Sequence, residues 1–259
     1  MKNKIWFQRI AWIICLICLW EVSSQTGLVN SFLLPPFSKV LTELVGELIK
    51  GQFAVQIVNS FALILFGFAI SLFLSIVICL TCVCSKMANS LMDTLCTILT
   101  PLPGVAVMPI IIMIFGIDTQ AMIVLLIHSV VWPLVIHMLG GMGVVPQIQV
   151  DYARNLGLSN REIMLEIYAP FMLPCLISGI KVGWSRSWRA LISAEMVFGM
   201  IGDIGGIGYY IFTNRAYGNM TRVMAGILVI VVIGVFIETI VLERIQEKTV
   251  KKWGMNRGI

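Results

Sequence analysis

Apolar residues in this chain are grouped into six long runs that are separated by shorter polar segments. The runs cover residues 5–21, 57–80, 91–115, 120–140, 171–194 and 222–242. Each is close to the ~20 residues that a helix needs to cross the hydrocarbon core of a bilayer. The pattern therefore predicts an all-α polytopic membrane protein of about six transmembrane helices, with residues 1–259 forming a single membrane domain.

The first run has two interpretations, because it follows Lys2 and Lys4 and is short enough for a signal peptide. Signal peptides end in small residues at the cleavage site, whereas Trp20 and Glu21 are bulky here. A run counted from Ile5 can just span if Arg9 reaches the headgroups. A retained membrane helix is favoured, and whether it spans fully is left open.

Composition supports the membrane interpretation and narrows the possible partners. Hydrophobic residues make up 59% of the chain and charged residues 12%, with a mean hydropathy of +0.96. Soluble domains carry about 25% charged residues, so lipid must cover much of this surface. The net charge is +5, but its basic clusters have no interleaved aromatic residues, so no nucleic-acid partner is expected.

Cysteine usage gives no clear site. The seven cysteines lie in or beside apolar runs, and Cys79, Cys82 and Cys84 have a spacing found in some metal sites. No histidine or second cysteine pair follows nearby to complete a metal site. Small apolar packing is the favoured role for the three, and disulfides are not expected.

The distribution of lysine and arginine predicts the orientation of the six spans. With both termini in the cytoplasm, 11 basic residues fall in inner segments and 4 in outer segments. Inner loops of membrane proteins are enriched in these residues. We therefore expect cytoplasmic N- and C-termini and a multi-pass location in the plasma membrane.

Two loops are long enough to contain helices of their own. Residues 36–50 have apolar residues at helical spacing after a possible Ser38 N-cap, which predicts an amphipathic helix on the outer face. The residue pattern of the expected cytoplasmic loop 141–170 predicts a helical hairpin. Asp151 would open its first short helix, Gly157 would end it, and Ser159 with Glu162 would form the capping box of a second.

This hairpin resembles the signature loop of ABC importer permeases. The family pattern is Glu-Ala-Ala, three residues, Gly, nine residues, Ile, one residue, Leu-Pro. Residues 151–153 (Asp-Tyr-Ala), Gly157, Ile167 and 169–170 (Ala-Pro) keep every spacing, with different residues at 151, 152 and 169. The segments 33–41, 100–118, 187–199 and 205–212 and the tail residue Trp253 are similar to the nitrate/sulfonate/taurine branch of that family.

The resemblance implies a type I ABC importer permease (MetI-like) fold and a translocation subunit that is not itself an enzyme. Its implied partners are cytoplasmic ABC ATPase subunits, an extracytoplasmic solute-binding protein, the lipid bilayer and a second copy of the permease. The implied substrate is a small anion such as a sulfonate, taurine or nitrate. The implied contacts with the ATPase come from the hairpin residues Asp151, Ala153, Arg154, Gly157 and Leu158.

ATP hydrolysis is not expected in this chain. A Walker A loop requires glycine directly before its lysine, and none of the nine lysines follows a glycine. No cofactor, metal or catalytic residue is therefore assigned, and ATP would be bound by the partner ATPase.

Three basic residues lie inside the fifth run: Lys181, Arg186 and Arg189. A basic residue at the centre of a membrane helix costs about 2.5–3.5 kcal/mol on insertion scales, so these residues should face protein, water or an interface. One hypothesis is an anion path lined by all three. The structural alternative pairs them with Glu195 or Asp203 or places them near the membrane boundaries.

Two other classes of protein remain as alternatives. A secondary transporter driven by an ion gradient would need acidic residues at mid-membrane and usually an inverted repeat, and no repeat is visible. A membrane-embedded enzyme would need converging reactive groups. His128 and His137 are nine residues apart and so lie on opposite sides of one helix, about 180° apart, which disfavours an enzyme.

Overall fold

The computed structural model describes the backbone of residues 2–201 and 205–250, and side chains within residues 7–201 and 205–246. Asp203, Trp253 and the basic tail residues Lys251, Lys252 and Arg257 lie outside the described residues. Every regular element within the described ranges is a helix. The helices in chain order are α1 (Lys2–Gln25), α2 (Phe37–Ile49), α3 (Gln52–Cys84), α4 (Lys86–Leu99), α5 (Gly104–Phe115), α6 (Thr119–Gly143), α7 (Gln147–Asn155), α8 (Asn160–Ile163), η1 (Met164–Tyr168), α9 (Ala169–Phe198), α10 (Ile207–Ala216), α11 (Met220–Phe236), η2 (Ile237–Leu242) and α12 (Glu243–Val250).

Within the described residues, five helical runs are long and apolar enough to cross a membrane, and a bent pair of helices brings the number to six. The five are Phe7–Gln25, Gln52–Cys84, Thr119–Gly143, Asn160–Phe198 and Met220–Gln246. The predicted all-α membrane fold is thus confirmed. Two runs are much longer than predicted, because α3 continues to Cys84 and α8, η1 and α9 follow one another without a break.

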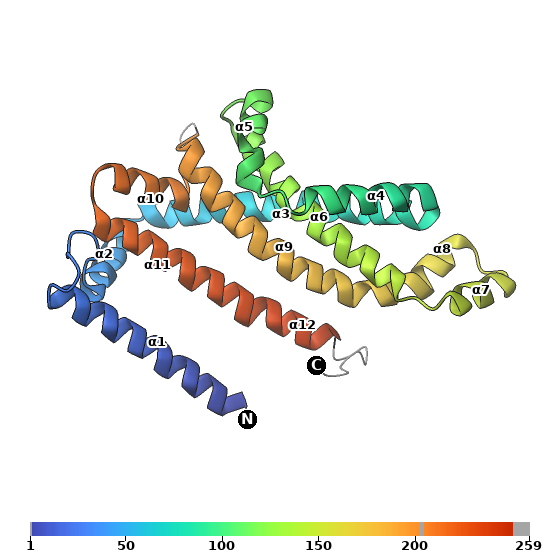
Figure 1. The fold of residues 1–259 in the computed structure, drawn as a ribbon, viewed down its shortest axis with the longest axis horizontal. Coiled ribbons are helices and arrows are strands. Elements are labelled where there is room, and N and C mark those ends of the chain that lie inside the picture. Colours follow the sequence, from blue (N-terminus) through green and yellow to red (C-terminus); the bar gives the residue numbers. More distant parts are fainter. Residues whose placement is uncertain (1, 202–204, 251–259) are drawn as a thin grey trace. The chain divides into compact units, whose positions relative to one another are not determined.

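The third apolar run differs from the single helix predicted over residues 91–115. It is divided into α4 and α5, which are bent by 103° relative to one another (Figure 1). Pro101 and Pro103 lie between the two helices, and Pro103 is the N-cap of α5. Proline lacks a backbone N–H and excludes the residue before it from helical geometry, so two prolines in three residues end the helix. By contrast, Pro109 and Pro133 lie inside helices.

The chain separates into two compact units, Met1–Ser60 with Glu195–Val232, and Phe61–Ala194 with Ile233–Ile259. In the first unit, the amphipathic helix predicted over 36–50 is confirmed as α2, but Ser38 is not its N-cap. Pro36 takes that position and offers no side-chain acceptor. The Glu21 carboxylate of α1 instead accepts hydrogen bonds from the Ser38 N–H (3.0 Å) and hydroxyl (2.7 Å).

A buried carboxylate from α9 organises the start of α10 in the same unit. Glu195 is 2% exposed, and its Oε1 and Oε2 accept hydrogen bonds from the Ser60 hydroxyl (2.6 Å) and the Gly208 N–H (2.8 Å). Ser60 Oγ also accepts from the Ile207 N–H at 2.9 Å. The N-cap residue Gly206 has no side chain, so Glu195 and Ser60 pair the free N–H groups of the first turn. The alternative that Glu195 pairs with the arginines of α9 is therefore wrong.

The second unit has a continuous apolar core between α3, α4, α6 and α9. Its buried residues are Cys79, Cys96, Val131, Val135, Met138 and Met172. All seven cysteines are free thiols, and Cys84 is exposed whereas Cys79 and Cys82 are buried. Cys79 therefore packs as a small apolar residue in this core.

Substituting Gly206 should disturb the cap on α10. A Cβ at Gly206 would collide with the Glu195 carboxylate, and Glu195 is held by its own hydrogen bonds. We expect Gly206→Ala to lower the free energy of unfolding by about 1–3 kcal/mol, the usual cost of overpacking. Thermal unfolding of the purified protein in detergent measures this change.

Gly46→Ala is the matched control, because Gly46 lies inside α2 and a Cβ there meets no atom within 4 Å. This substitution should stabilise the protein by about 0.5–1 kcal/mol. Equal melting temperatures for the two variants would contradict the assigned role of Glu195.

Candidate functional site

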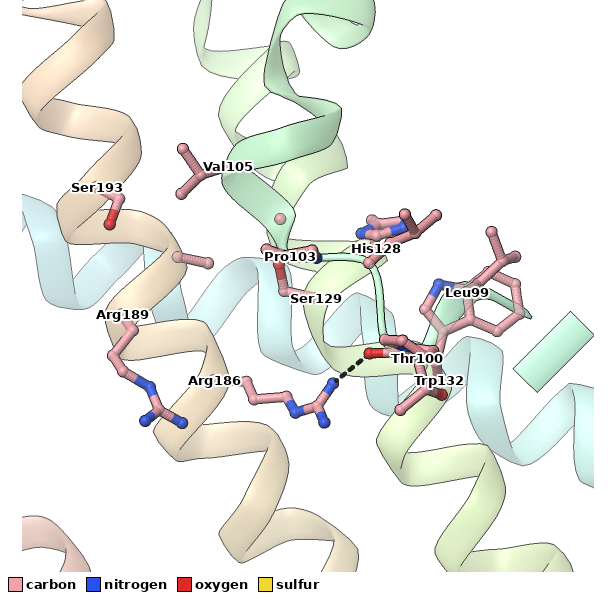
Figure 2. Close-up of a pocket in the computed structure, with 14 residues that line it drawn as sticks. Leu99, Thr100, Pro103, Val105, His128, Ser129, Trp132, Arg186, Arg189 and Ser193 are labelled. Carbon is pink, nitrogen blue, oxygen red and sulfur yellow. Dashed lines mark hydrogen bonds between the residues drawn. The ribbon is translucent and has the colours of Figure 1, made fainter. Parts of the chain in front are cut away.

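A cavity of about 340 Å³ lies in the second unit where α4 and α5 separate. Its walls come from the broken segment, from α6 and from α9 (Figure 2). The lining residues are Leu99, Thr100, Pro101, Leu102, Pro103, Gly104, Val105, His128, Ser129, Trp132, Arg186, Arg189, Ala190 and Ser193. None of them is acidic, so the charge at the cavity is positive.

Arg186 connects α9 to the broken segment. Its Nη1 donates a hydrogen bond of 3.3 Å to the Thr100 carbonyl, as Figure 2 shows. This carbonyl lies at the C-terminal end of α4, where the last carbonyl groups lack partners within the helix. Arg186 is half-buried and Arg189 exposed, and neither forms an ion pair with an acidic side chain among the described residues. The structure thus brings together two of the three basic residues singled out from the sequence.

Lys181 is placed differently from the two arginines. It is half-buried on the same helix, but it does not line the cavity. Lys181 lies more than one helical turn before Arg186, and its azimuth is about 80° from that of Arg189. A path lined by all three residues would therefore have to extend beyond this cavity.

Three polar side chains at the cavity were not predicted as site residues. Thr100 Oγ1, both ring nitrogens of His128 and Trp132 Nε1 are buried and have no hydrogen-bond partner among the described residues. His128 is therefore not a hydrogen-bonded contact between helices among the described residues. His128 contacts the edge of Trp132, with ring centroids 6.4 Å apart. The signal in the sequence that could have identified two of these residues is the four-residue spacing of His128 and Trp132, which places them on one side of a helix.

The start of α5 adds a further positive feature. Pro103, Gly104 and Val105 line the cavity, and the 12-residue helix that begins there has no side-chain cap. The first N–H groups of a helix carry a partial positive charge. Irregular backbone at membrane depth is tolerated where it lines a cavity, as in transporters with broken helices.

The cytoplasmic loop forms the helical hairpin predicted over residues 141–170, named here the elbow (residues 147–168). Gly157 has φ +84°, its N–H bonds the Arg154 carbonyl at 3.0 Å, and the Leu158 N–H bonds the Ala153 carbonyl at 3.1 Å. This pair of bonds is the Schellman motif, which ends helices at a left-handed glycine. The predicted role of Gly157 in ending the first helix is confirmed.

The second helix of the elbow also has the N-terminal cap that was predicted. Ser159 and Glu162 form a reciprocal capping box at the start of α8. Asp151 was expected to open the first helix, but α7 begins at Gln147 after Pro146, so Asp151 lies inside it. The Asp151 carboxylate instead accepts a hydrogen bond from Gln147 Nε2 at 3.1 Å. Pro146 fixes the earlier start because proline is favoured immediately before or at the first helical residue.

The elbow has a small apolar core. Of the residues assigned to the ATPase contact, some belong to this core and the others are exposed. Val150, Ala153 and Ile163 are buried, and Leu158 packs against them. Asp151, Arg154 and Gly157 are exposed. Ala153 and Leu158 therefore hold the elbow together in this structure.

One face of α7 is apolar and exposed, and it was not singled out from the sequence. Ile148, Tyr152 and Leu156 are 77%, 65% and 63% exposed. Their four-residue spacing places them along one side of the helix. Such a stripe on a short polar helix is typical of a surface that binds a groove in another protein.

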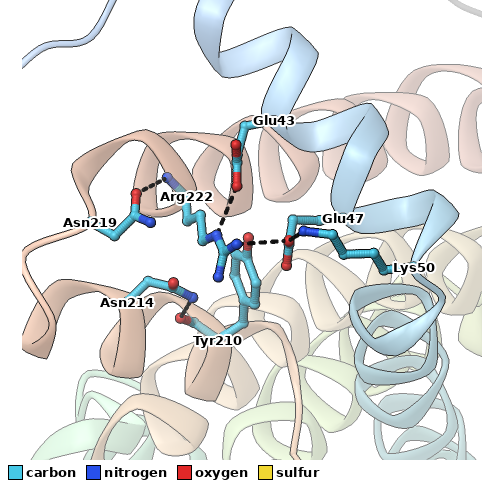
Figure 3. Close-up of polar contacts among 7 residues, drawn as sticks. All are labelled: Glu43, Glu47, Lys50, Tyr210, Asn214, Asn219 and Arg222. Atoms are coloured by element: carbon cyan, nitrogen blue, oxygen red, sulfur yellow. Dashed lines mark hydrogen bonds and ion pairs between the residues drawn. The ribbon is translucent and has the colours of Figure 1, made fainter.

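A separate polar network lies in the first unit (Figure 3). Arg222, near the start of α11, contacts Glu43 (2.8 Å) and Glu47 (3.1 Å) of α2, and Lys50 contacts Glu47 at 2.9 Å. Tyr210 lies beside Arg222 in Figure 3 and stacks on Phe53, with ring centroids 4.0 Å apart. This network holds the amphipathic α2 against α11 within the first unit. Both glutamates of α2 are paired, so we assign the network a structural role.

The helical membrane fold, the positive cavity at a broken helix and the structured elbow define a membrane transport subunit. Residues 83–252 match the family model of the binding-protein-dependent transport system inner membrane component. The chain belongs to this family, and it is an ABC importer permease. The expected MetI-like fold is confirmed by the same match.

Relatives match the chain over nearly its whole length. It is 28% identical to the putative aliphatic sulfonates transport permease protein SsuC of Bacillus subtilis, over 97% of this chain and 89% of the relative. It is 23% identical to the taurine transport system permease protein TauC of Escherichia coli, over 86% and 82%. It is 25% identical to the bicarbonate transport system permease protein CmpB of Synechococcus elongatus, over 92% and 90%.

Replacing Gly157 should loosen the elbow. An alanine at a left-handed position costs roughly 1–2 kcal/mol, which corresponds to about 5- to 30-fold faster opening of the turn. We expect Gly157→Ala to accelerate hydrogen exchange of the Leu158 amide by this factor in the purified protein. Gly140→Ala is the control, because Gly140 lies inside α6 with open space around it. Equal exchange rates in both variants would refute the role of Gly157.

Proposed function

We propose that this chain is the translocation subunit of an ATP-driven importer for a small organic or inorganic anion. The observation that carries the anion assignment is the cavity at the broken helix. Two arginines line it, no acidic side chain does, and an uncapped helix N-terminus adds partial positive charge. The relatives named for sulfonate, taurine and bicarbonate transport support the same class of substrate.

The elbow is proposed to couple this subunit to a cytoplasmic ATPase. Its exposed apolar stripe (Ile148, Tyr152 and Leu156) would enter a groove on the ATPase, with Asp151 and Arg154 beside it. A Schellman motif, a capping box and a small core hold the elbow together. Such a rigid element can transmit a displacement that a flexible loop would absorb. ATP would be bound and hydrolysed by the partner.

The remaining parts of the assembly follow from this role. A solute-binding protein would deliver the substrate at the outer face, and a second copy of the permease would complete the path. The excess of lysine and arginine in segments on the side of the elbow supports cytoplasmic N- and C-termini. The elbow would then lie on the same side of the membrane as the ATPase.

Removing the cavity arginines should weaken transport. The test uses proteoliposomes that contain the permease, its ATPase and its binding protein, with taurine, ethanesulfonate, nitrate and bicarbonate as probes. We expect Arg186→Ala or Arg189→Ala to raise the KM for an imported anion roughly 10-fold, since a hydrogen bond to a charged group contributes about 1.5–3 kcal/mol.

Arg9→Ala is the control for this experiment, because it removes an exposed positive charge from α1 outside the cavity. Its KM should match that of the wild type. If both cavity variants import the anion with unchanged KM, the arginines are not part of the path.

Polar substitutions on the exposed stripe should weaken the contact with the ATPase. Truncation of a central aromatic residue in an interface often costs 2 kcal/mol or more, so we expect Tyr152→Ser to weaken ATPase binding about 30-fold. Binding of the purified ATPase to the solubilised permease measures this, and the mass of the complex reports how many permease copies it contains.

Arg161→Ser, on the exposed side of α8, should bind the ATPase like the wild type. Unchanged binding of Tyr152→Ser and Ile148→Ser would show that the ATPase docks elsewhere.

A further inference from the structure

We infer that the cavity at the broken helix is a selective subsite for an oxyanion headgroup, and that Thr100, His128 and Trp132 are its specificity-determining residues. The inference rests on the proposed import of an anion and extends it. In this view the permease selects its substrate through its own side chains, in addition to any selection by the binding protein. The two arginines supply charge, and the three other residues supply directed hydrogen bonds.

Several polar atoms around the cavity lack hydrogen-bond partners among the described residues. Thr100 Oγ1, His128 Nδ1, His128 Nε2 and Trp132 Nε1 are all buried, and none has a partner among the described residues. Buried polar groups in native proteins are nearly always hydrogen-bonded, and leaving one unpaired is costly. Four such atoms around one cavity indicate that its normal occupant supplies hydrogen-bond partners, among them acceptors for the Trp132 N–H and for the donor nitrogen of His128.

The chemistry of these groups favours an anionic occupant. The indole N–H of Trp132 and the guanidinium of Arg186 can only donate hydrogen bonds, and neutral His128 always has one donor nitrogen. No carboxylate lines the cavity to accept from a cationic ligand. An occupant with several acceptor oxygens and a negative charge satisfies the donors of this set, whereas an amine or a metal cation does not.

Part of the remaining wall of the cavity is apolar. Leu99, Leu102 and Val105 contribute apolar side chains beside the donors. Organic ligands are commonly held by apolar walls with a few placed polar groups. The subsite therefore fits a compact oxyanion that carries a short aliphatic group, and ethanesulfonate is the simplest probe of this kind.

The chain offers one matched control for the indole N–H of Trp132 and another for the hydroxyl of Thr100. Trp188 also has a buried Nε1 without a partner among the described residues, but it does not line the cavity. Thr97 lies in α4, which ends directly before Thr100. Its hydroxyl donates a hydrogen bond to the Asp93 carbonyl within that helix. Comparing Trp132→Phe with Trp188→Phe, and Thr100→Val with Thr97→Val, separates loss of a cavity donor from loss of the same group elsewhere.

The experiment measures competitive uptake by the reconstituted complex of permease, ATPase and binding protein. Ethanesulfonate and nitrate compete for import, and every variant uses the same binding protein, so the selectivity of that protein cancels. We expect Trp132→Phe and Thr100→Val each to change the ratio of the two kcat/KM values by about fivefold or more, because one hydrogen bond to an anion is lost. The control variants Trp188→Phe and Thr97→Val should keep the wild-type ratio, and their ATPase activity stimulated by the loaded binding protein should stay within twofold of the wild type.

Three outcomes are decisive. Unchanged ratios in both cavity variants, with transport intact, would show that the cavity holds only water and would overturn the subsite while leaving the proposed function in place. Failure of the wild type to import any of the tested anions would instead overturn the proposed function and the subsite with it. If Thr100→Val does not assemble, Thr100→Ser retains the hydroxyl and must preserve the wild-type ratio, and a changed ratio there overturns the inference.

Discussion

The pairing of backbone polar groups where helices end is the constraint on which this structure depends. In an apolar environment an unpaired N–H or carbonyl costs several kcal/mol, so a helix can stop only where another group replaces its missing partners. Glu195 and Ser60 do this at the start of α10, and Arg186 does so at the end of α4. At the elbow, which is proposed to lie in water, the chain bonds its own backbone around Gly157.

This constraint explains why the positive charges lie where they do. A guanidinium has five N–H donors in a fixed fork, and its bond to the Thr100 carbonyl uses only one of them. The same residue can therefore stabilise the broken helix and still present donors to the cavity. A lysine ammonium also has three N–H donors, but they radiate from one nitrogen and lack the planar fork that matches an oxyanion. Structural support and anion attraction are thus compatible in Arg186.

The sequence predicted the parts of the fold that depend on local patterns. The capping box at Ser159 and the left-handed turn at Gly157 were predicted because their determinants lie within a few residues. The bend between α4 and α5 was not predicted, since residues 91–115 were interpreted as one span despite Pro101 and Pro103. The partners of Glu195 and the unpaired atoms of His128 could not be predicted, because they depend on contacts between helices far apart in sequence, such as Ser60 with Glu195.

The elbow and the cavity are joined by one uninterrupted helical run from Asn160 to Phe198 (Figure 1). Arg186 lies 26 residues after Asn160, roughly 40 Å along a helix that rises 1.5 Å per residue. A displacement of the proposed ATPase contact would therefore reach Arg186 through continuous backbone. The Arg186–Thr100 bond, at 3.3 Å, is long for such a contact, whereas the elbow is fixed by several shorter bonds. Because this bond uses one of the five guanidinium donors, a movement of α9 would act on the α4 end and on the remaining donors at the cavity together.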